Sequence, residues 1–210
     1  MLAPMSWLVA ALYDGVMGPP ERACVGAWRR ELLASLAGDV LEIGAGTGYN
    51  LPYYPALARV TLTEPDAAMR ERLAARSLAG RDGAGMAIVD ASAESLPFAD
   101  ASFDAVVGTF VLCTVDRPAA VLGEVRRILR PGGAYLFLEH GAAAEDSARL
   151  RWQRRIEPAW RVLADGCHLT RRADEAIERA GLRIEESRRE SMRRALPFLR
   201  PTVRGVARRV

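Results

Sequence analysis

A glycine-rich turn follows the first apolar strand pattern of the chain, and its residue types fit ligand binding. Residues 40–48 are Val-Leu-Glu-Ile-Gly-Ala-Gly-Thr-Gly, so glycines stand at positions 44, 46 and 48, and Glu42 precedes the first of them by two residues. Glycines at such a turn let the backbone approach a ligand, because no Cβ stands in the way. A turn of this kind after a strand is typical of the ligand sites of doubly wound α/β sheets.

Two carboxylates indicate the charge of that ligand. Glu42 would repel a pyrophosphate, but it suits the ammonium end of S-adenosylmethionine, whose methionine part also carries a positive sulfonium. Glu64 ends the next strand pattern, 20 residues after Gly44. Doubly wound folds place a ribose-binding carboxylate at this distance. The two spacings together predict S-adenosyl-L-methionine as the cofactor, with S-adenosyl-L-homocysteine as its product.

Short apolar strand patterns alternate with helical patterns, which predicts βαβ units and a mainly parallel sheet. The expected strands are residues 40–43, 59–63, 86–89, 103–109 and 134–139. The expected helices are residues 19–36, 67–79 with Asp66 as N-cap, 117–129, 147–163, and a last helix capped by Thr170 and ending at Gly181. Residues 182–191 and 202–208 alternate apolar and polar side chains, which predicts two antiparallel edge strands.

Composition excludes several kinds of site. Half of the 210 residues are hydrophobic, and the length fits one domain. All 29 basic residues are Arg, so neither a lysine Schiff base nor a Walker-type phosphate lysine is present. Cys24, Cys113 and Cys167 are scattered and form no Cys-x-x-Cys pair, so we expect neither a disulfide framework nor a metal site.

Charge and hydropathy raise the question of nucleic-acid or membrane contact. Residues 106–210 hold 21 Arg against 13 acids, while residues 1–105 hold 8 Arg against 13 acids. Solvated helix surfaces explain such an excess more often than nucleic acid does, and no nucleic acid is expected. The apolar residues 1–13 stop at Asp14, short of the ~20 residues that a membrane span needs. We expect an amphipathic lid helix with at most peripheral membrane contact, a cytoplasmic location, and a monomer or homodimer.

Three motifs in the first half carry a resemblance to a known family. Leu-Pro-Phe at 96–98, Ser-Phe-Asp-Ala-Val at 102–106 and Leu-Arg-Pro-Gly-Gly at 129–133 follow one another in this order. With the glycine turn they resemble class I S-adenosylmethionine-dependent methyltransferases over most of residues 38–140. Ser92 stands where that family usually has an adenine-binding Asp. The resemblance implies a Rossmann-like fold with a seven-stranded, mainly parallel sheet, helices on both faces and a helical lid. The cofactor-binding residues that we expect are Tyr13, Glu42, Gly44, Ala45, Gly46, Gly48, Asn50, Glu64, Pro65, Met69, Ser92, Ala93, Glu94 and Thr109.

The second half is similar to the methyltransferase-like 7 group of thiol S-methyltransferases. The motifs are Val-Leu-Cys-Thr-Val at 111–115, Leu-Glu-His at 138–140, Pro-Ala-Trp at 158–160, Asp-Gly-Cys-His-Leu-Thr at 165–170 and Leu-Arg-Pro at 199–201. The resemblance implies methyl transfer to a small-molecule thiol. Within one methyltransferase domain, residues 1–37 would be lid helices, 38–140 the cofactor-binding core, 141–181 a substrate-lid insertion with its helix, and 182–210 edge strands.

Direct transfer from a sulfonium to a thiolate demands alignment and exclusion of water more than acid or base catalysis. His140 is the candidate general base, because it ends a core strand on the expected ligand side. The substrate-side candidates are Cys113, Glu139, Asp165 and His168. Carbon or oxygen methylation of a quinol or phenol, nitrogen methylation of a phospholipid amine, and a non-catalytic S-adenosylmethionine- or RNA-binding module remain alternatives.

Overall fold

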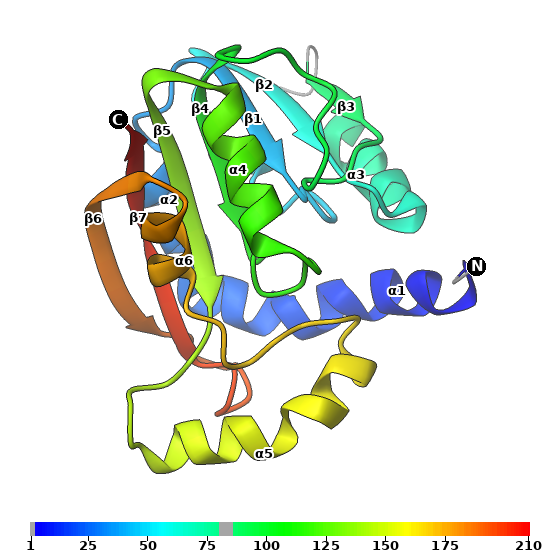
Figure 1. Cartoon of the computed structure of the whole chain (residues 1–210). Helices are drawn as coiled ribbons and strands as arrows, with labels where there is room; N and C mark the ends of the chain where they lie inside the picture. Colours follow the sequence, from blue (N-terminus) through cyan, green and yellow to red (C-terminus); the bar gives the residue numbers. More distant parts are fainter. Residues whose placement is uncertain (1–2, 80–85) are drawn as a thin grey trace.

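A computed structural model describes residues 3–79 and 86–210 and contains a seven-stranded mixed sheet (Figure 1). Its strand order is β3-β2-β1-β4-β5-β7-β6. The strands are β1 (Gly38–Ile43), β2 (Ala58–Thr63), β3 (Ala87–Val89), β4 (Phe103–Thr109), β5 (Leu129–His140), β6 (Leu182–Ser191) and β7 (Pro201–Arg209). The predicted Rossmann-like sheet is confirmed, and each of the five predicted core strands is present.

Strands β1 to β5 pair in parallel, whereas β7 runs antiparallel to β5 and to β6. The prediction that both tail strands lie at the sheet edge is wrong for β7, which is inserted between β5 and β6. Burial explains the difference, since residues Thr202 to Gly205 of β7 are buried while most of β6 is exposed. Only β6 of the two is an edge strand.

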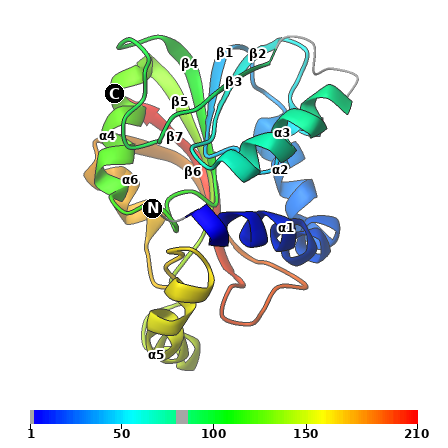
Figure 2. The ribbon, with the colours of Figure 1, turned by 90° about the vertical axis from the view of Figure 1, so that its right-hand side faces the viewer.

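Helices cover both faces of the sheet (Figure 2). The helices α2 (Gly26–Leu33) and α3 (Ala67–Ala79) lie on one face, and α4 (Pro118–Ile128) and α6 (Ala173–Arg179) lie on the other. Each pair of helices covers a separate apolar core on its face of the sheet. Val121, Leu122 and Val125 of α4 pack with Ile177 of α6, while Leu33 of α2 packs in the second core with Leu73 of α3.

The N-terminal residues stay helical where the sequence predicts a break. Helix α1 (Ala3–Pro20) continues through a π-helical turn, Glu21–Val25, into α2. The prediction of a separate helix beginning at Pro19 is therefore wrong. Pro20 keeps helical angles, φ −61° and ψ −41°. A proline lacks an N–H and crowds the preceding turn, and a wide π-helical turn is one way in which a helix accommodates such a disturbance.

Two helices lie at the carboxyl ends of the parallel strands. Helix α1 crosses below these strand ends in Figure 1, and α5 (Ala148–Leu163) lies beyond it. Ser147 caps α5 by accepting a hydrogen bond from the Leu150 N–H at 3.0 Å. The predicted Thr170 cap of α6 is wrong, because that helix starts at Ala173 with Arg172 as the N-cap residue. Within residues 3–79 and 86–210, no helix has both the length and the apolar character that crossing a bilayer requires.

Candidate active site

The turn after β1 is built on three glycines with positive φ angles of +58°, +57° and +88° at Gly44, Gly46 and Gly48. Glycine adopts such angles at little cost, because it has no Cβ. A Cβ added at Gly48 would meet methyl groups of Leu51 and Leu73 at 2.7 and 2.8 Å, whereas one added at Gly46 would have no atom within 4 Å. Gly48 is therefore needed for packing, and Gly46 leaves open space beside the backbone.

That open space belongs to a cavity of about 210 Å³ at the carboxyl ends of the strands. Nine of the fourteen expected cofactor-binding residues line it, as does one expected substrate residue, Asp165. Glu64, Asp66 and Asp165 are the charged residues of its lining, and all three are acidic. The nine are Tyr13, Gly44, Gly46, Glu64, Pro65, Met69, Ser92, Ala93 and Thr109.

Glu64 connects the ends of β1 and β2. One carboxylate oxygen accepts the Gly46 N–H at 2.8 Å, and the other accepts the Asp66 N–H at 2.9 Å. Burial raises the pKa of Glu64, and these two N–H donors oppose the rise. Asp66 in turn caps α3 by accepting the Met69 N–H at 2.8 Å, as predicted. The carboxylate is held at the cavity wall by backbone donors.

Helix α1 is fixed to the glycine turn by Asp14. Its carboxylate accepts a hydrogen bond from the Thr47 hydroxyl at 2.7 Å and pairs with Arg76 of α3 at 3.0 Å. Tyr13, the preceding residue, lines the cavity. Burial raises the pKa of the Tyr13 phenol well above its usual range, so it stays neutral. The lid helix therefore contributes one wall of the cavity.

Glu42 lies in a buried polar network behind the turn and does not line the cavity. Its carboxylate is 1% exposed and accepts hydrogen bonds from Asn50 Nδ2 at 2.8 Å and from the Tyr54 hydroxyl at 2.7 Å. Arg29, 2% exposed, donates to Asn50 Oδ1 at 2.7 Å and to the Thr109 hydroxyl at 2.9 Å. Burial raises the pKa of Glu42 to about 7, against the two hydrogen bonds and the charge of Arg29.

Four further expected cofactor residues also lie outside the lining. Ala45 is buried, Gly48 packs on leucines, and Asn50 belongs to the Glu42 network. Glu94 faces away, since its carboxylate pairs with Arg117 at 2.8 Å at the start of α4. Its backbone N–H donates to the hydroxyl of Ser92, a residue of the lining, at 3.2 Å.

Of the four expected substrate residues, one lines the cavity and three do not. Asp165, with φ +47°, lines the cavity. His168 lies apart from it, with Nδ1 3.2 Å from Glu157 Oε1. Glu139 is fully buried, and its carboxylate accepts the N–H groups of Val111, Leu112 and Cys113 at 2.8, 2.9 and 3.3 Å. Burial raises the pKa of Glu139 to about 7 despite these bonds. Glu139 thus shapes the loop after β4, which lines the cavity at Phe110 and Val111.

The expected base, His140, is buried behind that loop. Its Nε2 lies 2.9 Å from the Cys167 sulfur, and its ring stacks on Phe110 with 6.4 Å between centroids. Neither His140 nor Cys113 lines the cavity, although Phe110 and Thr114 do. The structure therefore brings His140, Cys113 and Cys167 together one layer behind the cavity wall.

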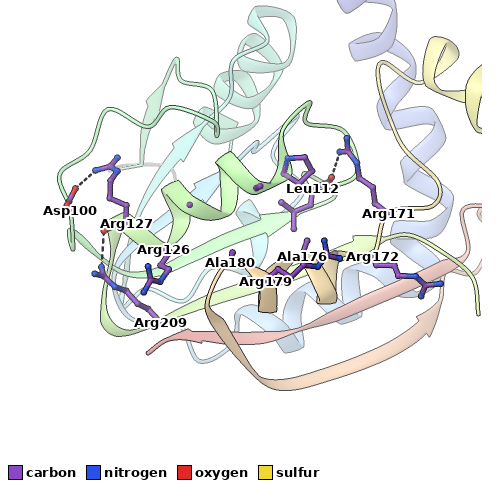
Figure 3. Close-up of a pocket in the computed structure, with 14 residues that line it drawn as sticks. Asp100, Leu112, Arg126, Arg127, Arg171, Arg172, Ala176, Arg179, Ala180 and Arg209 are labelled. Atoms are coloured by element: carbon purple, nitrogen blue, oxygen red, sulfur yellow. Dashed lines mark hydrogen bonds and ion pairs between the residues drawn. The ribbon is translucent and has the colours of Figure 1, made fainter.

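A second cavity, of about 820 Å³, lies between α4 and α6 and has the opposite charge (Figure 3). Six arginines and one acid, Asp100, form the charged part of its lining. Much of this charge is already paired, as Arg127 is with Asp100 at 2.8 Å. The arginines are Arg126, Arg127, Arg171, Arg172, Arg179 and Arg209.

Comparisons with known proteins decide the family. Residues 41–137 match the family described as "Methyltransferase domain". Thiol S-methyltransferase TMT1B of Homo sapiens is 37% identical over 174 residues, which are 79% of this chain and 71% of that protein. The chain belongs to the class I S-adenosylmethionine-dependent methyltransferases. TMT1B of Rattus norvegicus and TMT1A of Homo sapiens are each 41% identical, over 142 and 161 residues, which are 67% and 72% of this chain. The chain spans 58% and 66% of the length of these two relatives.

Solved structures agree with this methyltransferase in fold. The [4+2]-cyclase SpnF is 18% identical with a TM-score of 0.76, and the match covers 97% of this chain and 93% of SpnF. A possible histamine N-methyltransferase from Thermotoga maritima is 19% identical with a TM-score of 0.69, and the match covers 98% and 100% of the two chains. A cyclase and a methyltransferase share this fold, so the fold alone does not fix the chemistry.

Several residues that line the cavity are not among the expected site residues, although three of them belong to the motif at 111–115. Phe110, Val111, Thr114 and Val115 line the cavity from the loop after β4. The strand order reverses between β1 and β4, and ligands of doubly wound sheets bind at such a switch point, so topology is the signal for this loop. Arg29 had no comparable signal, because an arginine within a helix pattern normally indicates a solvated face.

Proposed function

We propose that this methyltransferase binds S-adenosyl-L-methionine in the 210 Å³ cavity and transfers its methyl group to a small-molecule thiol. The observation that carries the proposal is the charge of the cavity, whose ionisable lining groups include three carboxylates and no arginine. A donor with a positive sulfonium and a positive ammonium is attracted to such a site. A dinucleotide pyrophosphate would be repelled.

The residues of the cavity fit this donor. Gly46 leaves room beside the backbone, because a Cβ there would have no atom within 4 Å. Glu64 is held at the end of β2, where doubly wound folds bind ribose hydroxyls. Ser92 and Ala93 line the cavity in the segment that follows β3 and are our candidates for the adenine side. Bound there, the donor supplies an electrophilic methyl group on sulfur.

The protein's part in the reaction is positioning. The acceptor sulfur forms a bond to the methyl carbon while the bond from that carbon to the sulfonium breaks, and the acceptor's proton passes to solvent. A free thiol has a pKa of about 8.5, so a part of it is already the reactive thiolate at neutral pH. Tyr13 of α1 and Asp165 line the cavity and would exclude water from the reacting atoms. We assign no base role to His140, because its Nε2 is held by Cys167 behind the wall.

The thiol acceptor is supported by the relatives named thiol S-methyltransferases, which are 37 to 41% identical to this chain. The test is incubation of the purified chain with methyl-labelled S-adenosylmethionine and a panel of alkyl thiols, aryl thiols, quinols, catechols and phosphatidylethanolamine. We expect label in a thioether product from at least one thiol. Label in a quinol, catechol or lipid with none in any thiol would contradict the acceptor and leave the donor site intact.

A failure of the donor site has a different signature. Calorimetry with S-adenosylmethionine and S-adenosylhomocysteine measures binding without any acceptor. We expect saturable binding of both at one site per chain. No binding of either molecule, or tighter binding of a dinucleotide, would contradict the whole proposal.

A further inference from the structure

Three side chains that bind soft metal ions meet behind the cavity wall. Cys113 follows β4, His140 ends β5, and Cys167 lies in the loop after α5. Their exposed fractions are 2%, 6% and 8%. The two sulfur atoms and one imidazole nitrogen all lie within 4.8 Å of one another. Segments distant in sequence therefore deliver a buried set of two sulfurs and one nitrogen.

One ring nitrogen of the cluster has no partner among residues 3–79 and 86–210, and the Cys113 sulfur makes only weak contacts. His140 Nδ1 is buried and has no hydrogen-bond partner within the described part of the chain. The Cys113 sulfur lies 3.4 Å from the Phe110 carbonyl oxygen and 3.5 Å from the Thr114 hydroxyl. Thiols are weak donors and acceptors, and a buried imidazole with a free ring nitrogen costs stability. Apolar packing would not require these three groups to converge.

We propose that Cys113, His140 and Cys167 bind a thiophilic metal ion, with Zn²⁺ as the representative of its class. Zinc binds thiolate sulfur at about 2.3 Å and imidazole nitrogen at about 2.0 Å, in tetrahedral geometry. Ligand atoms in such a site lie roughly 3.6 to 3.8 Å apart. The three ligand atoms of the cluster already lie within 4.8 Å of one another. Two thiolates would also balance the charge of a divalent ion.

The surrounding backbone holds the ligand-bearing segments in place. The His168 N–H, next to Cys167, donates to the Cys113 carbonyl at 2.7 Å, and the Glu139 carboxylate accepts the Cys113 N–H at 3.3 Å. Support of this kind orients the ligands before a metal arrives. Thr114 and Asp165, close in sequence to the two cysteines, line the donor cavity. A bound ion would therefore fix that wall, whichever acceptor is methylated.

The spacing of the cysteines predicts no metal site, because Cys24, Cys113 and Cys167 form no Cys-x-x-Cys pair. Cys167 lies 27 residues after His140, and the sheet brings the two together. A site assembled from strand ends gives no local spacing signal.

The first test measures metal in the full-length protein after any affinity tag is removed. We expect one Zn²⁺ per chain by mass spectrometry of the metal content. After removal of the zinc with a chelator, one equivalent of Co²⁺ should produce thiolate-to-cobalt charge-transfer absorption in the near ultraviolet. X-ray absorption at the zinc edge should show two sulfur neighbours, with nitrogen or oxygen neighbours completing the four-coordinate shell. Reduced protein that binds neither ion overturns the proposal.

Matched variants assign the ligands. Cys167→Ser and His140→Ala should weaken Co²⁺ binding on the order of a hundredfold or more. Cys24→Ser and His168→Gln remove the remaining cysteine and the remaining histidine, and should bind Co²⁺ like the parent protein. Equal binding by all four variants would overturn the site. If a ligand variant fails to fold, X-ray absorption on the parent protein remains as the test: two sulfur neighbours support the site, and none overturns it. A Cys113–Cys167 disulfide whose reduction restores no metal binding also overturns the proposal.

Discussion

The Glu64 carboxylate accepts a 2.8 Å hydrogen bond from the Gly46 N–H and thereby joins the end of β2 to the turn that follows β1. Both residues line the same acidic cavity. This contact places a carboxylate beside the one glycine of the turn that leaves open space. The spacing between the glycine turn and Glu64 in the sequence therefore corresponds to a direct contact in the cavity wall.

Replacing this carboxylate should weaken donor binding. Glu64→Gln removes the negative charge and one acceptor oxygen, while the side chain keeps its size. We expect the Kd for S-adenosylmethionine to rise roughly tenfold by calorimetry, which corresponds to about 1.4 kcal/mol. Glu94→Gln is the matched control, since Glu94 pairs with Arg117 outside the cavity lining. An unchanged Kd for Glu64→Gln, or an equal loss for both variants, would contradict the ribose assignment.

Two glycine variants should separate binding from folding. Gly46→Ala places a methyl group in open space of the cavity, so we expect donor binding to be lost at a stability cost of about 1 kcal/mol from the positive φ. Gly48→Ala would overlap the methyl groups of Leu51 and Leu73, so it should lower stability by about 2 to 3 kcal/mol. Urea unfolding and calorimetry on both variants check the contrast. Equal unfolding midpoints would contradict it.

Asp14 should control how long the donor stays bound. Its side chain is 30% exposed, and its pair with Arg76 is therefore worth less than about 1 kcal/mol of stability. Loss of the Thr47 and Arg76 contacts would nevertheless loosen α1, which carries Tyr13 at the cavity. We expect Asp14→Ala to speed dissociation of S-adenosylmethionine several-fold in stopped-flow measurements, with little change in unfolding midpoint. Asp39→Ala removes a carboxylate of similar exposure that pairs with Arg59 and Arg130, away from α1, and should leave the rate unchanged.

Local patterns predicted the parallel half of the sheet well. Short apolar patterns that end at a glycine or an acid predicted β1 and β2 to within two residues. The position of β7 between β5 and β6 was missed, since strand order depends on contacts distant in sequence. The helical path through Pro19 and Pro20 was missed because prolines normally begin or break helices.

The site was predictable where the spacing of residues fixes their location. Gly44, Gly46 and Glu64 lie at strand ends, and strand ends of a parallel sheet share one edge. Arg29 and Glu42 are different, because their burial in one network arises only when α2 packs on the sheet. Glu94 follows β3 at the position where a cofactor-binding residue was expected. Its side chain nevertheless pairs with Arg117 and lies outside the lining.

The arginine-rich half should not bind nucleic acid strongly. Many of its arginines are already paired, including Arg172 with Glu145, Arg189 with Asp174 and Arg208 with Glu185. A surface that neutralises few phosphates shows a shallow dependence of affinity on salt. We expect fluorescence anisotropy with a labelled RNA to give weak binding that changes little between low and physiological salt. Tight binding with a steep salt slope would favour the RNA-binding alternative.

Burial of Glu42 makes stability depend on pH. Its pKa rises from 4.5 in the unfolded chain to about 7 in the folded protein, because burial disfavours the charged carboxylate. Between these pH values the folded state holds a proton that the unfolded state has lost, so stability falls as pH rises. The loss is complete above about pH 7 and amounts to roughly 3 kcal/mol at most.

Glu42→Gln should remove this loss, because an amide resembles the protonated acid and does not ionise. We expect the parent protein to lose more unfolding free energy than the variant between pH 5 and pH 8, by about 2 kcal/mol in urea titrations. Glu178→Gln changes an exposed glutamate and should keep the parent's pH dependence. A variant that falls in parallel with the parent would show that Glu42 is already ionised at pH 5, held by the nearby charge of Arg29 and by its two hydrogen bonds.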